Sequence, residues 1–381
     1  MKNLLETTPE CYFNHGGCSF VTPQTLDAVT THLGLEHRLG NAMADLMTAA
    51  EKRSLYKLAA AAVGADANDI AITDSHTTGW EKALRGISLN SGDVVLTTRS
   101  EWGGNLRALR HVAQRHGAWV MPMPSTANGA VCLKSLASLL SDKIKLISVS
   151  WIGSNGGHTE PVAEIGQLAE LHGIPFFVDA SQVVGQMPVN VQRIRCDVLT
   201  TPGRKWLRGP KGTGFMYLRP SFLAKCQSSG ALDEWRDPAD HLAAKHFEAS
   251  NASVALQMGL LEALDQFHKT GIEQIQEQIL ARSCRIWEEL QAIPGVICLR
   301  DTAPDHGMVS FNVAGLNPFV VRERLMSAGI EVAANQAAFT PLDMQSRQLD
   351  GVVRVTPHAC TTWEEIEMLV EAIRELSQTG Q

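Results

Sequence analysis

The sequence predicts an α/β protein with a large, mostly parallel β-sheet covered by helices, followed by a small α+β domain. Short apolar runs alternate with amphipathic segments through the middle of the chain. The length of 381 residues suits one large domain and a smaller one, and 44% hydrophobic against 19% charged residues is typical of a globular core. Alternation of this kind favours parallel strands joined by helices.

Five apolar runs with little internal alternation are interpreted as parallel strands buried on both faces. They are DVVLTT (93–98), WVMPMP (119–124), KLISVSW (145–151), IPFFVDA (174–180) and DVLTT (197–201). GTGFMYL (212–218) is interpreted as an antiparallel partner of the fifth strand. The polar stretch 227–241 then interrupts the pattern.

Amphipathic helices are expected between and after these runs. In EPVAEIGQLAELHG, Val162, Ile165, Leu168 and Leu171 recur at three-residue steps before Gly173 ends the helix. Further helices are expected at 253–267, 273–292, 318–328 and 362–376, with strands at 308–314 and 352–357. We therefore predict an N-terminal segment (1–20) that contributes to the active site and the small domain, a large domain (21–268) and a small C-terminal domain (269–381).

Composition excludes several classes of function. The net charge of −7 argues against a nucleic-acid surface. The N-terminus has no apolar signal region and no segment approaches a membrane span, so a cytoplasmic location is expected. The eight cysteines have no CxxC spacing, so we expect neither a zinc site nor a disulfide framework, and no metal. Small-molecule chemistry is the better expectation.

Two residues near the ends of neighbouring strands suggest that chemistry. Asp179 ends one predicted strand and Lys205 follows the next, at the edge where open α/β sheets bind ligands. A pyridoxal enzyme needs a lysine to bind its cofactor and a buried carboxylate to keep the pyridinium nitrogen protonated. Lys205 could instead be a surface lysine in a basic loop with Arg204 and Arg208, but the pairing with Asp179 favours the cofactor.

VDASQ (178–182) followed by PGRKWLRGPKGTGFMYL (202–218) resembles the class V aminotransferase family over nearly the whole chain. The resemblance implies fold type I of the pyridoxal-5′-phosphate enzymes. In this fold a large domain contains a mostly parallel sheet of the seven-stranded type, and a small α+β domain follows at the C-terminus. It also implies Lys205 as the catalytic lysine and Asp179 on the pyridinium nitrogen. Gln182 would bind the phenolic oxygen of the cofactor and Arg204 its phosphate. Pro202 stands where many members have a phosphate-binding serine.

Two further segments fit the cofactor by the same resemblance. Ser75, His76 and Thr77 lie between a strand and a helix, where free N–H groups and hydroxyls suit a phosphate, although a plain helix cap is the alternative. Trp102 would stack on the pyridine ring, with a buried core tryptophan as the alternative. The flanking Gly103 and Gly104 favour a close approach to the ligand.

Other site residues are also implied by the resemblance. Asn155, in an S-N-G-G turn, would lie over the cofactor and near the substrate carboxylate, and the alternative is a turn chosen only for its Asn-Gly geometry. Asn251 would reach the phosphate of a second subunit, which implies a homodimer. Arg354 would bind the α-carboxylate of an amino-acid substrate, or else pair with a structural acid. We also assign Asn14 and His15 to the substrate.

The reaction is predicted from finer features. HLGLEHRLGNAM, GRKWLRGPKGTGF and ANQAAFTPLDM most resemble the hercynylcysteine sulfoxide lyase and isopenicillin N epimerase-like branch, although Ala359 and Cys360 replace its aromatic pair. Cysteine desulfurases need a nucleophilic cysteine before the arginine, and 331–351 contains none. We therefore predict a C–S β-lyase that acts on an S-substituted cysteine or cysteine sulfoxide and releases pyruvate and ammonia. The alternatives are an epimerase or racemase and an aminotransferase; a cysteine desulfurase is less favoured, and a non-catalytic binding module least of all.

Overall fold

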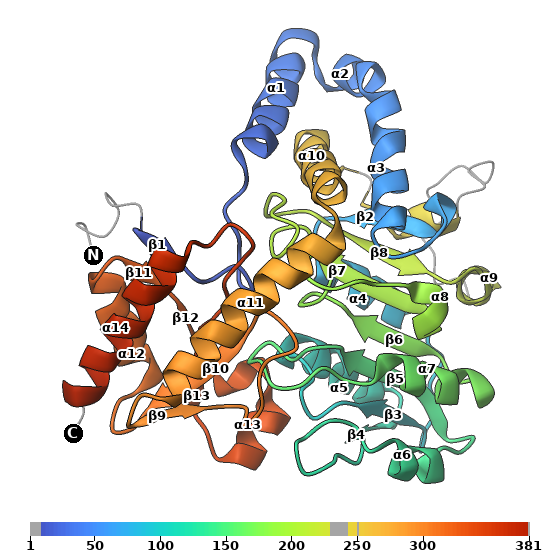
Figure 1. The fold of residues 1–381 in the computed structure, drawn as a ribbon. Coiled ribbons are helices and arrows are strands. Elements are labelled where there is room, and N and C mark those ends of the chain that lie inside the picture. The colour runs from blue at the N-terminus through green and yellow to red at the C-terminus, as the bar shows by residue number, and fades with distance from the viewer. Residues whose placement is uncertain (1–8, 229–242, 250, 380–381) are drawn as a thin grey trace.

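The computed structural model describes residues 9–228, 243–249 and 251–379. Figure 1 shows a large body built on one sheet and a smaller body built on another, connected by the long helix α11. The predicted interruption at 227–241 lies almost entirely outside the described residues. Within the described parts of the chain, no helix is long and apolar enough to cross a membrane.

The large body contains a seven-stranded sheet that is parallel apart from one strand. β3, β4, β5, β6 and β7 pair in parallel, whereas β8 runs antiparallel to both of its neighbours, β2 and β7. The predicted fold class is therefore confirmed. In sheet order the strands are β2 (Ile70–Thr73), β8 (Gly214–Leu218), β7 (Val198–Pro202), β6 (Phe176–Asp179), β5 (Ile144–Ser150), β3 (Val94–Thr97) and β4 (Trp119–Pro122).

Both faces of this sheet are buried apart from the edge strand β4, because successive side chains of the other strands enter different cores. Leu96, Ile147 and Val178 pack on one face with residues of α3, α7 and α10. Their neighbours Val95 and Phe177 pack on the other face with residues of α4, α5 and α9. The helices of this body are α3 (Ala49–Ala61), α4 (His76–Leu84), α5 (Gly103–Arg115), α6 (Leu133–Leu139), α7 (Val162–Leu171), α8 (Val191–Ile194), α9 (Pro220–Ser228) and α10 (Val254–Thr270).

Two details of the large body differ from the prediction. β4 is an edge strand rather than a buried one, with Trp119 67% exposed. Leu171 is 78% exposed, so it does not belong to the buried face of α7. The reason is geometric: nine residues at about 100° per residue bring Leu171 to the side opposite Val162. Ile165 and Ala169 complete the buried face with Val162.

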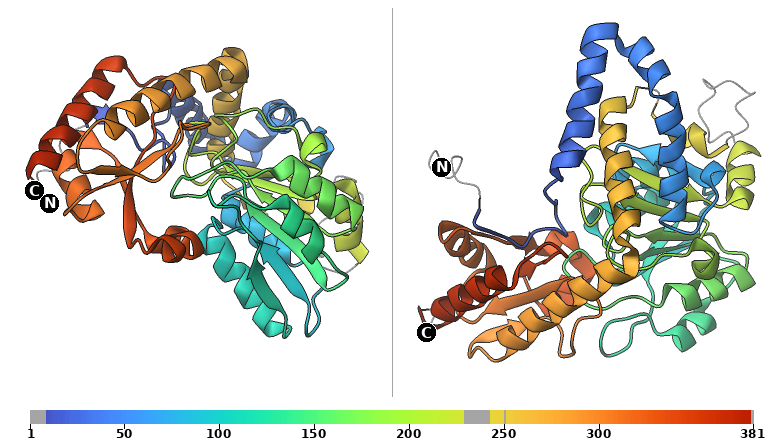
Figure 2. Two further views of the ribbon diagram at one scale, coloured as in Figure 1. Left: turned by 60° about the horizontal axis from the view of Figure 1, so that its bottom comes forward. Right: turned by 45° about the horizontal axis from the view of Figure 1, so that its top comes forward.

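Three helices near the N-terminus, which the sequence pattern did not predict, form an arch on the large body. Figure 2 shows α1 (Pro23–Leu39), α2 (Asn41–Met47) and α3 rising beside α10. α1 and α3 both pack against α10. Gly40, with φ of +76°, forms the corner between α1 and α2 in a conformation that glycine adopts without strain.

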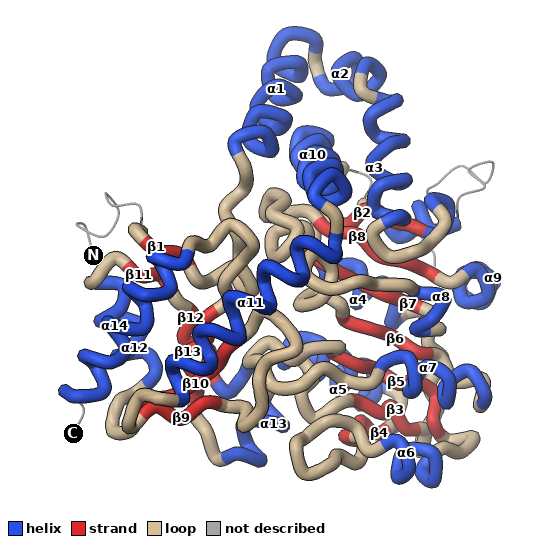
Figure 3. Tube along the Cα trace, viewed as in Figure 1, coloured by secondary structure: helices blue, strands red, loops and turns tan. Residues whose placement is uncertain are grey.

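The small body has an antiparallel four-stranded sheet with helices beside it (Figure 3). Residues Cys11–Tyr12 (β1) pair in parallel with Ile330–Glu331 (β11), so the N-terminal segment is joined to this body. The predicted boundary at 268/269 falls inside α10. The strands are β12 (Ala333–Gln336), β13 (Gly351–Val355), β10 (Val309–Val313) and β9 (Val296–Cys298), and the helices are α11 (Ile272–Gln291), α12 (Pro318–Ser327), α13 (Pro341–Arg347) and α14 (Trp363–Thr379).

The close packing of α7 gives a stability prediction. A Cβ on Gly166 would lie 1.9 Å from the carbonyl oxygen of Ile194, so Gly166→Ala must push two backbone segments apart. We expect a loss of about 1–3 kcal/mol in the free energy of unfolding. Gly34→Ala in α1 is the matched control, because its Cβ would meet only an ordinary contact at 3.5 Å and alanine favours a helix by about 1 kcal/mol. In a thermal unfolding experiment, the midpoint of Gly166→Ala should fall below that of the wild type, and the midpoint of Gly34→Ala should not. Equal midpoints for the two variants would contradict this packing.

Candidate active site

A cavity of about 420 Å³ lies at the carboxyl ends of β6 and β7 and faces the small body. Residues of the N-terminal segment, the large sheet and the small sheet together form its wall. Ten predicted site residues line it: Asn14, Ser75, His76, Thr77, Trp102, Asp179, Gln182, Arg204, Lys205 and Arg354. Strand ends of the α/β sheet thus place side chains from distant parts of the sequence around one space.

Three predicted site residues are not in the wall of the cavity. His15 is buried behind it, where its Nδ1 lies 2.9 Å from Ser19 Oγ. Asn155 is fully buried and donates to Thr340 Oγ1 at 2.9 Å, although its neighbour Ser154 does line the cavity. Asn251 is exposed. In the single chain, these three side chains therefore lie outside the cavity wall.

Asp179 is a buried carboxylate whose two oxygens are both held by donors. Oδ1 accepts from the backbone N–H of Ser181 at 2.8 Å, and Oδ2 accepts from Asn105 Nδ2 at 3.0 Å. His76 Nε2 lies 3.3 Å from the same Oδ2. These contacts orient the carboxylate while it remains on the cavity wall. Such a carboxylate suits a cationic ring N–H as its partner.

His76 contributes its imidazole and its backbone to different parts of the site. Its imidazole does not point to the helix terminus but sits between Thr200 Oγ1 at 2.7 Å and Asn105 Oδ1 at 2.9 Å, close to Asp179. Only its backbone belongs to the first turn of α4. There, Ser75 Oγ accepts from Thr78 N at 3.1 Å. The backbone N–H groups in the first turn of a helix have no acceptor within the helix, so the first turn of α4 can bind an anion.

Trp102 lines the cavity and meets the His76 ring edge-on, with 5.7 Å between centroids. The glycines after it have a packing role rather than the expected ligand contact. A Cβ on Gly104 would lie 2.2 Å from the indole, and one on Gly103 would lie 1.9 Å from the carbonyl oxygen of Ala338. Their missing side chains leave room for the tryptophan and for the small body.

Lys205 follows β7 and is surrounded by other charged groups. Burial lowers the pKa of its amine to about 7, with Arg204 and Arg354 adding to the effect and Asp179 opposing it. An ordinary lysine has a pKa of 10.5. Because only the neutral amine is a nucleophile and a base, a large fraction of Lys205 is chemically competent near neutral pH.

Arg354, on β13 of the small sheet, brings a buried cation to the cavity wall. Its Nη1 donates to the carbonyl oxygen of Ser154 at 2.6 Å and its Nη2 to Asn14 Oδ1 at 3.3 Å. Nε has no hydrogen-bond partner, and none of the ion pairs found among the described residues involves Arg354. Burial, together with Arg204, lowers its pKa to about 10, so it is still cationic. A buried cation without an acid is a site for an anionic ligand.

The sequence interpretation missed the residues beneath Asp179. Glu101 is fully buried, and its oxygens accept from Ser150 at 2.6 Å, Ser148 at 2.7 Å and Asn105 at 3.0 Å. Burial raises its pKa, and the hydrogen bonds from these serines oppose that rise. Asn105 thus connects Glu101 to Asp179. An available signal was the spacing of Glu101 and Asn105, four residues apart at a strand end.

The cavity fits pyridoxal 5′-phosphate. Asp179 is placed to hold a pyridinium N–H, Lys205 offers a neutral amine, and the first turn of α4 with Arg204 offers an anion site. Ser181 also lines the cavity, and its Oγ is buried with no hydrogen-bond partner among the described residues. Gln182 is already engaged: its Nε2 donates to the Gly16 carbonyl oxygen at 2.9 Å and its Oε1 accepts from Trp206 at 3.0 Å, which leaves one N–H free.

Comparisons with known proteins agree with this fold and with the expected cofactor. The family model described as Aminotransferase class-V matches residues 12–369. A probable cysteine desulfurase from Methanothermobacter thermautotrophicus is 28% identical over 84% of this chain and 82% of its own length. The cystine C–S lyase C-DES, in complex with its reaction product cysteine persulfide, is similar with a TM-score of 0.85 and 26% identity, covering 98% of this chain and 99% of its own. The apo cysteine desulfurase from Thermococcus onnurineus NA1 shares the fold with a TM-score of 0.85 at 23% identity, covering 97% and 95%.

These comparisons correct the predicted reaction. The prediction of a C–S β-lyase for S-substituted cysteines or cysteine sulfoxides, with cysteine desulfurase less favoured, is wrong, because the relatives are named cysteine desulfurases. The low ranking of a desulfurase depended on one missing cysteine in 331–351, and a sulfur acceptor does not have to belong to that segment or to the chain. The finer resemblance to one lyase branch stays a prediction. On its fold, its site and its family model, the chain belongs to the class V aminotransferase family of pyridoxal-5′-phosphate-dependent enzymes.

Proposed function

We propose that this enzyme is a cysteine desulfurase, which breaks the C–S bond of L-cysteine, releases L-alanine and passes the sulfur to a thiol. The observation that carries the proposal is the pair of groups on the cavity walls: the unpaired guanidinium of Arg354 and the amine of Lys205, with a pKa of about 7. Together they suit the carboxylate and the Cα proton of a small amino acid. The names of the relatives support cysteine as that amino acid.

The reaction balances without an added oxidant or reductant. L-cysteine and a thiol give L-alanine and a persulfide: the Cβ–S bond breaks, a bond forms between the two sulfur atoms, and Cβ takes up a proton. Pyridoxal 5′-phosphate, when bound, supplies an electron sink conjugated to Cα. Lys205 Nζ removes the Cα proton, Asp179 keeps a ring N–H protonated, and Arg354 holds the carboxylate in a fixed orientation.

The sulfur acceptor is proposed to be a thiol that enters from outside. Residues 331–351 contain no cysteine, and none lines the cavity in the described parts of the chain. Cys360 is exposed, with its Sγ 3.9 Å from His358 Nδ1, away from the cavity wall. C-DES, at 26% identity, has cysteine persulfide as its reaction product, which supports a persulfide that leaves the enzyme.

A homodimer with active sites at the interface is proposed as the assembly. Asn251 is exposed in the single chain and is therefore accessible to a second subunit. Sedimentation at twice the 41.4 kDa chain mass would test this assembly. Exposed apolar residues on α1 and α2 support a subunit interface on these two helices: Leu26, Leu33, Leu39, Met43, Leu46 and Met47.

The cytoplasmic location stays a prediction.

The main test is the identity of the products. With L-cysteine and dithiothreitol, we expect L-alanine and sulfide in equal amounts, at a rate that rises with thiol concentration. Cys360→Ala, the matched control for a protein acceptor, should keep this activity. Chromatography of the amino acid and a colorimetric sulfide assay provide the measurements. Pyruvate and ammonia in place of alanine, or a loss of alanine formation in Cys360→Ala, would overturn the proposal.

The pKa of Lys205 predicts how the enzyme captures its cofactor. The amine is protonated below its pKa and neutral above it, so the rate at which the apoenzyme captures pyridoxal 5′-phosphate should rise with pH through about 7. A near-visible absorption band reports the capture, and Lys205→Ala should never develop it. A rate that keeps rising beyond pH 9 would show instead an amine close to its ordinary pKa of 10.5.

Substitution of Arg354 is expected to weaken substrate binding while the cofactor stays bound. Arg354→Gln removes the buried cation, so kcat/KM for L-cysteine should fall by about 30-fold or more, mainly through KM. The cofactor absorption band should persist, which separates this loss from misfolding. Arg285→Gln is the control, because Arg285 is exposed and pairs with Glu289 at 2.7 Å on α11. An unchanged KM in the Arg354 variant would remove the carboxylate role.

A further inference from the structure

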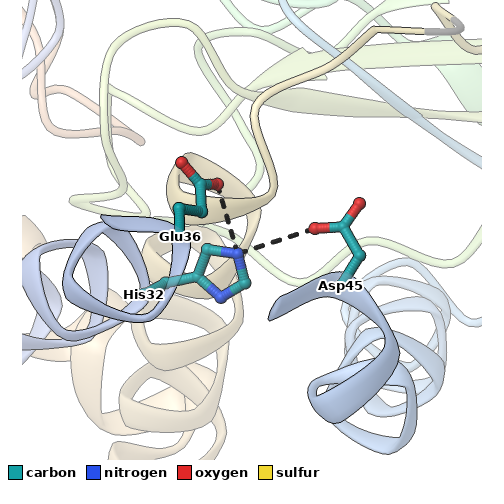
Figure 4. A group of neighbouring side chains, drawn as sticks. All are labelled: His32, Glu36 and Asp45. Carbon is teal, nitrogen blue, oxygen red and sulfur yellow. Dashed lines mark ion pairs between the residues drawn. The ribbon is translucent and has the colours of Figure 1, made fainter. Parts of the chain in front are cut away.

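Three potential metal ligands meet at the corner between α1 and α2, outside the active-site cavity. His32 Nε2 lies 3.3 Å from Glu36 Oε1 and 3.7 Å from Asp45 Oδ1. One ligand atom from each residue lies within 4.8 Å of the others. Figure 4 shows the three side chains pointing toward one another, two from α1 and one from α2. None of them lines the active-site cavity.

The two ring nitrogens of His32 are buried without a hydrogen-bond partner among the described residues. Its side chain is only 1% exposed, and neither ring nitrogen makes a hydrogen bond to any described residue. Buried imidazole nitrogens normally have a partner, because their desolvation is costly. Nε2 is aimed between the two carboxylates, whose side chains are 21% and 41% exposed. An ion could therefore enter from the carboxylate side and meet a buried nitrogen.

The local sequence positions the three groups. Glu36 follows His32 by four residues, so both lie on one face of α1. Gly40 turns the chain, and α2 then brings Asp45 back toward that face. The spacing H-x3-E-x8-D is spread over two helices, and only the corner at Gly40 makes it a cluster. For that reason the sequence, which predicted no metal, gave no signal here.

We propose that His32, Glu36 and Asp45 bind one divalent transition-metal ion of the Zn²⁺ class, which fixes the corner between α1 and α2. Zn²⁺ binds imidazole nitrogen and carboxylate oxygen at about 2.0–2.2 Å, which places tetrahedral ligand atoms roughly 3.3–3.6 Å apart. The separations of 3.3 and 3.7 Å are close to that spacing. A neutral imidazole and two carboxylates also balance the charge of the ion, and water completes the coordination.

The choice of ion follows from the ligands. An imidazole nitrogen suits zinc and its neighbours better than Mg²⁺ or Ca²⁺, which prefer sites made only of oxygen. In the single chain the three residues are absent from the cavity wall, so the ion would not contact that cavity. Its effect is on the arch: α1 and α2 would be held together by three strong bonds in place of the weak contacts of two partly exposed carboxylates.

Metal binding by the intact holoenzyme tests the site. After chelation and dialysis, the wild type should bind one equivalent of Zn²⁺ in a calorimetric titration, and Mg²⁺ should not compete. His32→Ala, Glu36→Gln and Asp45→Asn should each weaken that binding at least 10-fold. His37→Ala is the matched control, because His37 is an exposed histidine on the same helix, and it should bind as the wild type does.

Two further measurements keep the outcome unambiguous. Saturating Zn²⁺ should raise the thermal midpoint of the wild type and of His37→Ala but not of the three ligand variants. The cofactor absorption band should be the same in all variants, which shows that each is folded. No Zn²⁺ binding by the wild type, or equal binding by the ligand variants, would overturn the site and leave His32 with only its contacts to Glu36 and Asp45.

Discussion

The site depends on one buried carboxylate, that of Asp179 at the carboxyl end of β6. A charge in this position is costly unless donors surround it, and the backbone of Ser181 and the amide of Asn105 supply two of them. Glu101 below accepts from the same amide, and His76 completes the group around the carboxylate. The side chain that faces the cavity is therefore fixed by residues from β6, α4 and α5.

The charges across the cavity complement that carboxylate. Arg204, Lys205 and Arg354 line the same space, so positive groups outnumber the single lining acid, Asp179. Burial lowers the pKa of Lys205, with Arg204 and Arg354 adding to its effect, and Arg354 has no acidic partner among the described residues. A phosphate near α4 and a substrate carboxylate near Arg354 would each restore the balance. The same electrostatics thus activates the lysine and creates the need for anionic ligands.

The fate of the substrate at Cβ is the property that the site residues constrain least. The chemistry of Lys205 and Asp179 is common to many outcomes, because both act at Cα and at the ring. The outcome at Cβ depends on what lies above the substrate and on what receives the sulfur. A missing cysteine in one segment excludes an acceptor there, but a thiol can also arrive from solution. Similarity over the whole chain carried more weight than that single position.

The sequence by itself determined the strands of the large sheet, the position of Lys205 and Asp179 at neighbouring strand ends, and the small C-terminal body. These follow from local patterns: apolar runs bury on both faces of a parallel sheet, and strand ends place side chains at one edge. Only the tertiary structure decided the role of His76, the burial of Asn155, the network through Asn105 and Glu101, and the meeting of His32 with Asp45. Each of these depends on distances between segments that are far apart in the sequence, or that are separated by a change of chain direction such as the one at Gly40. No local periodicity encodes such distances.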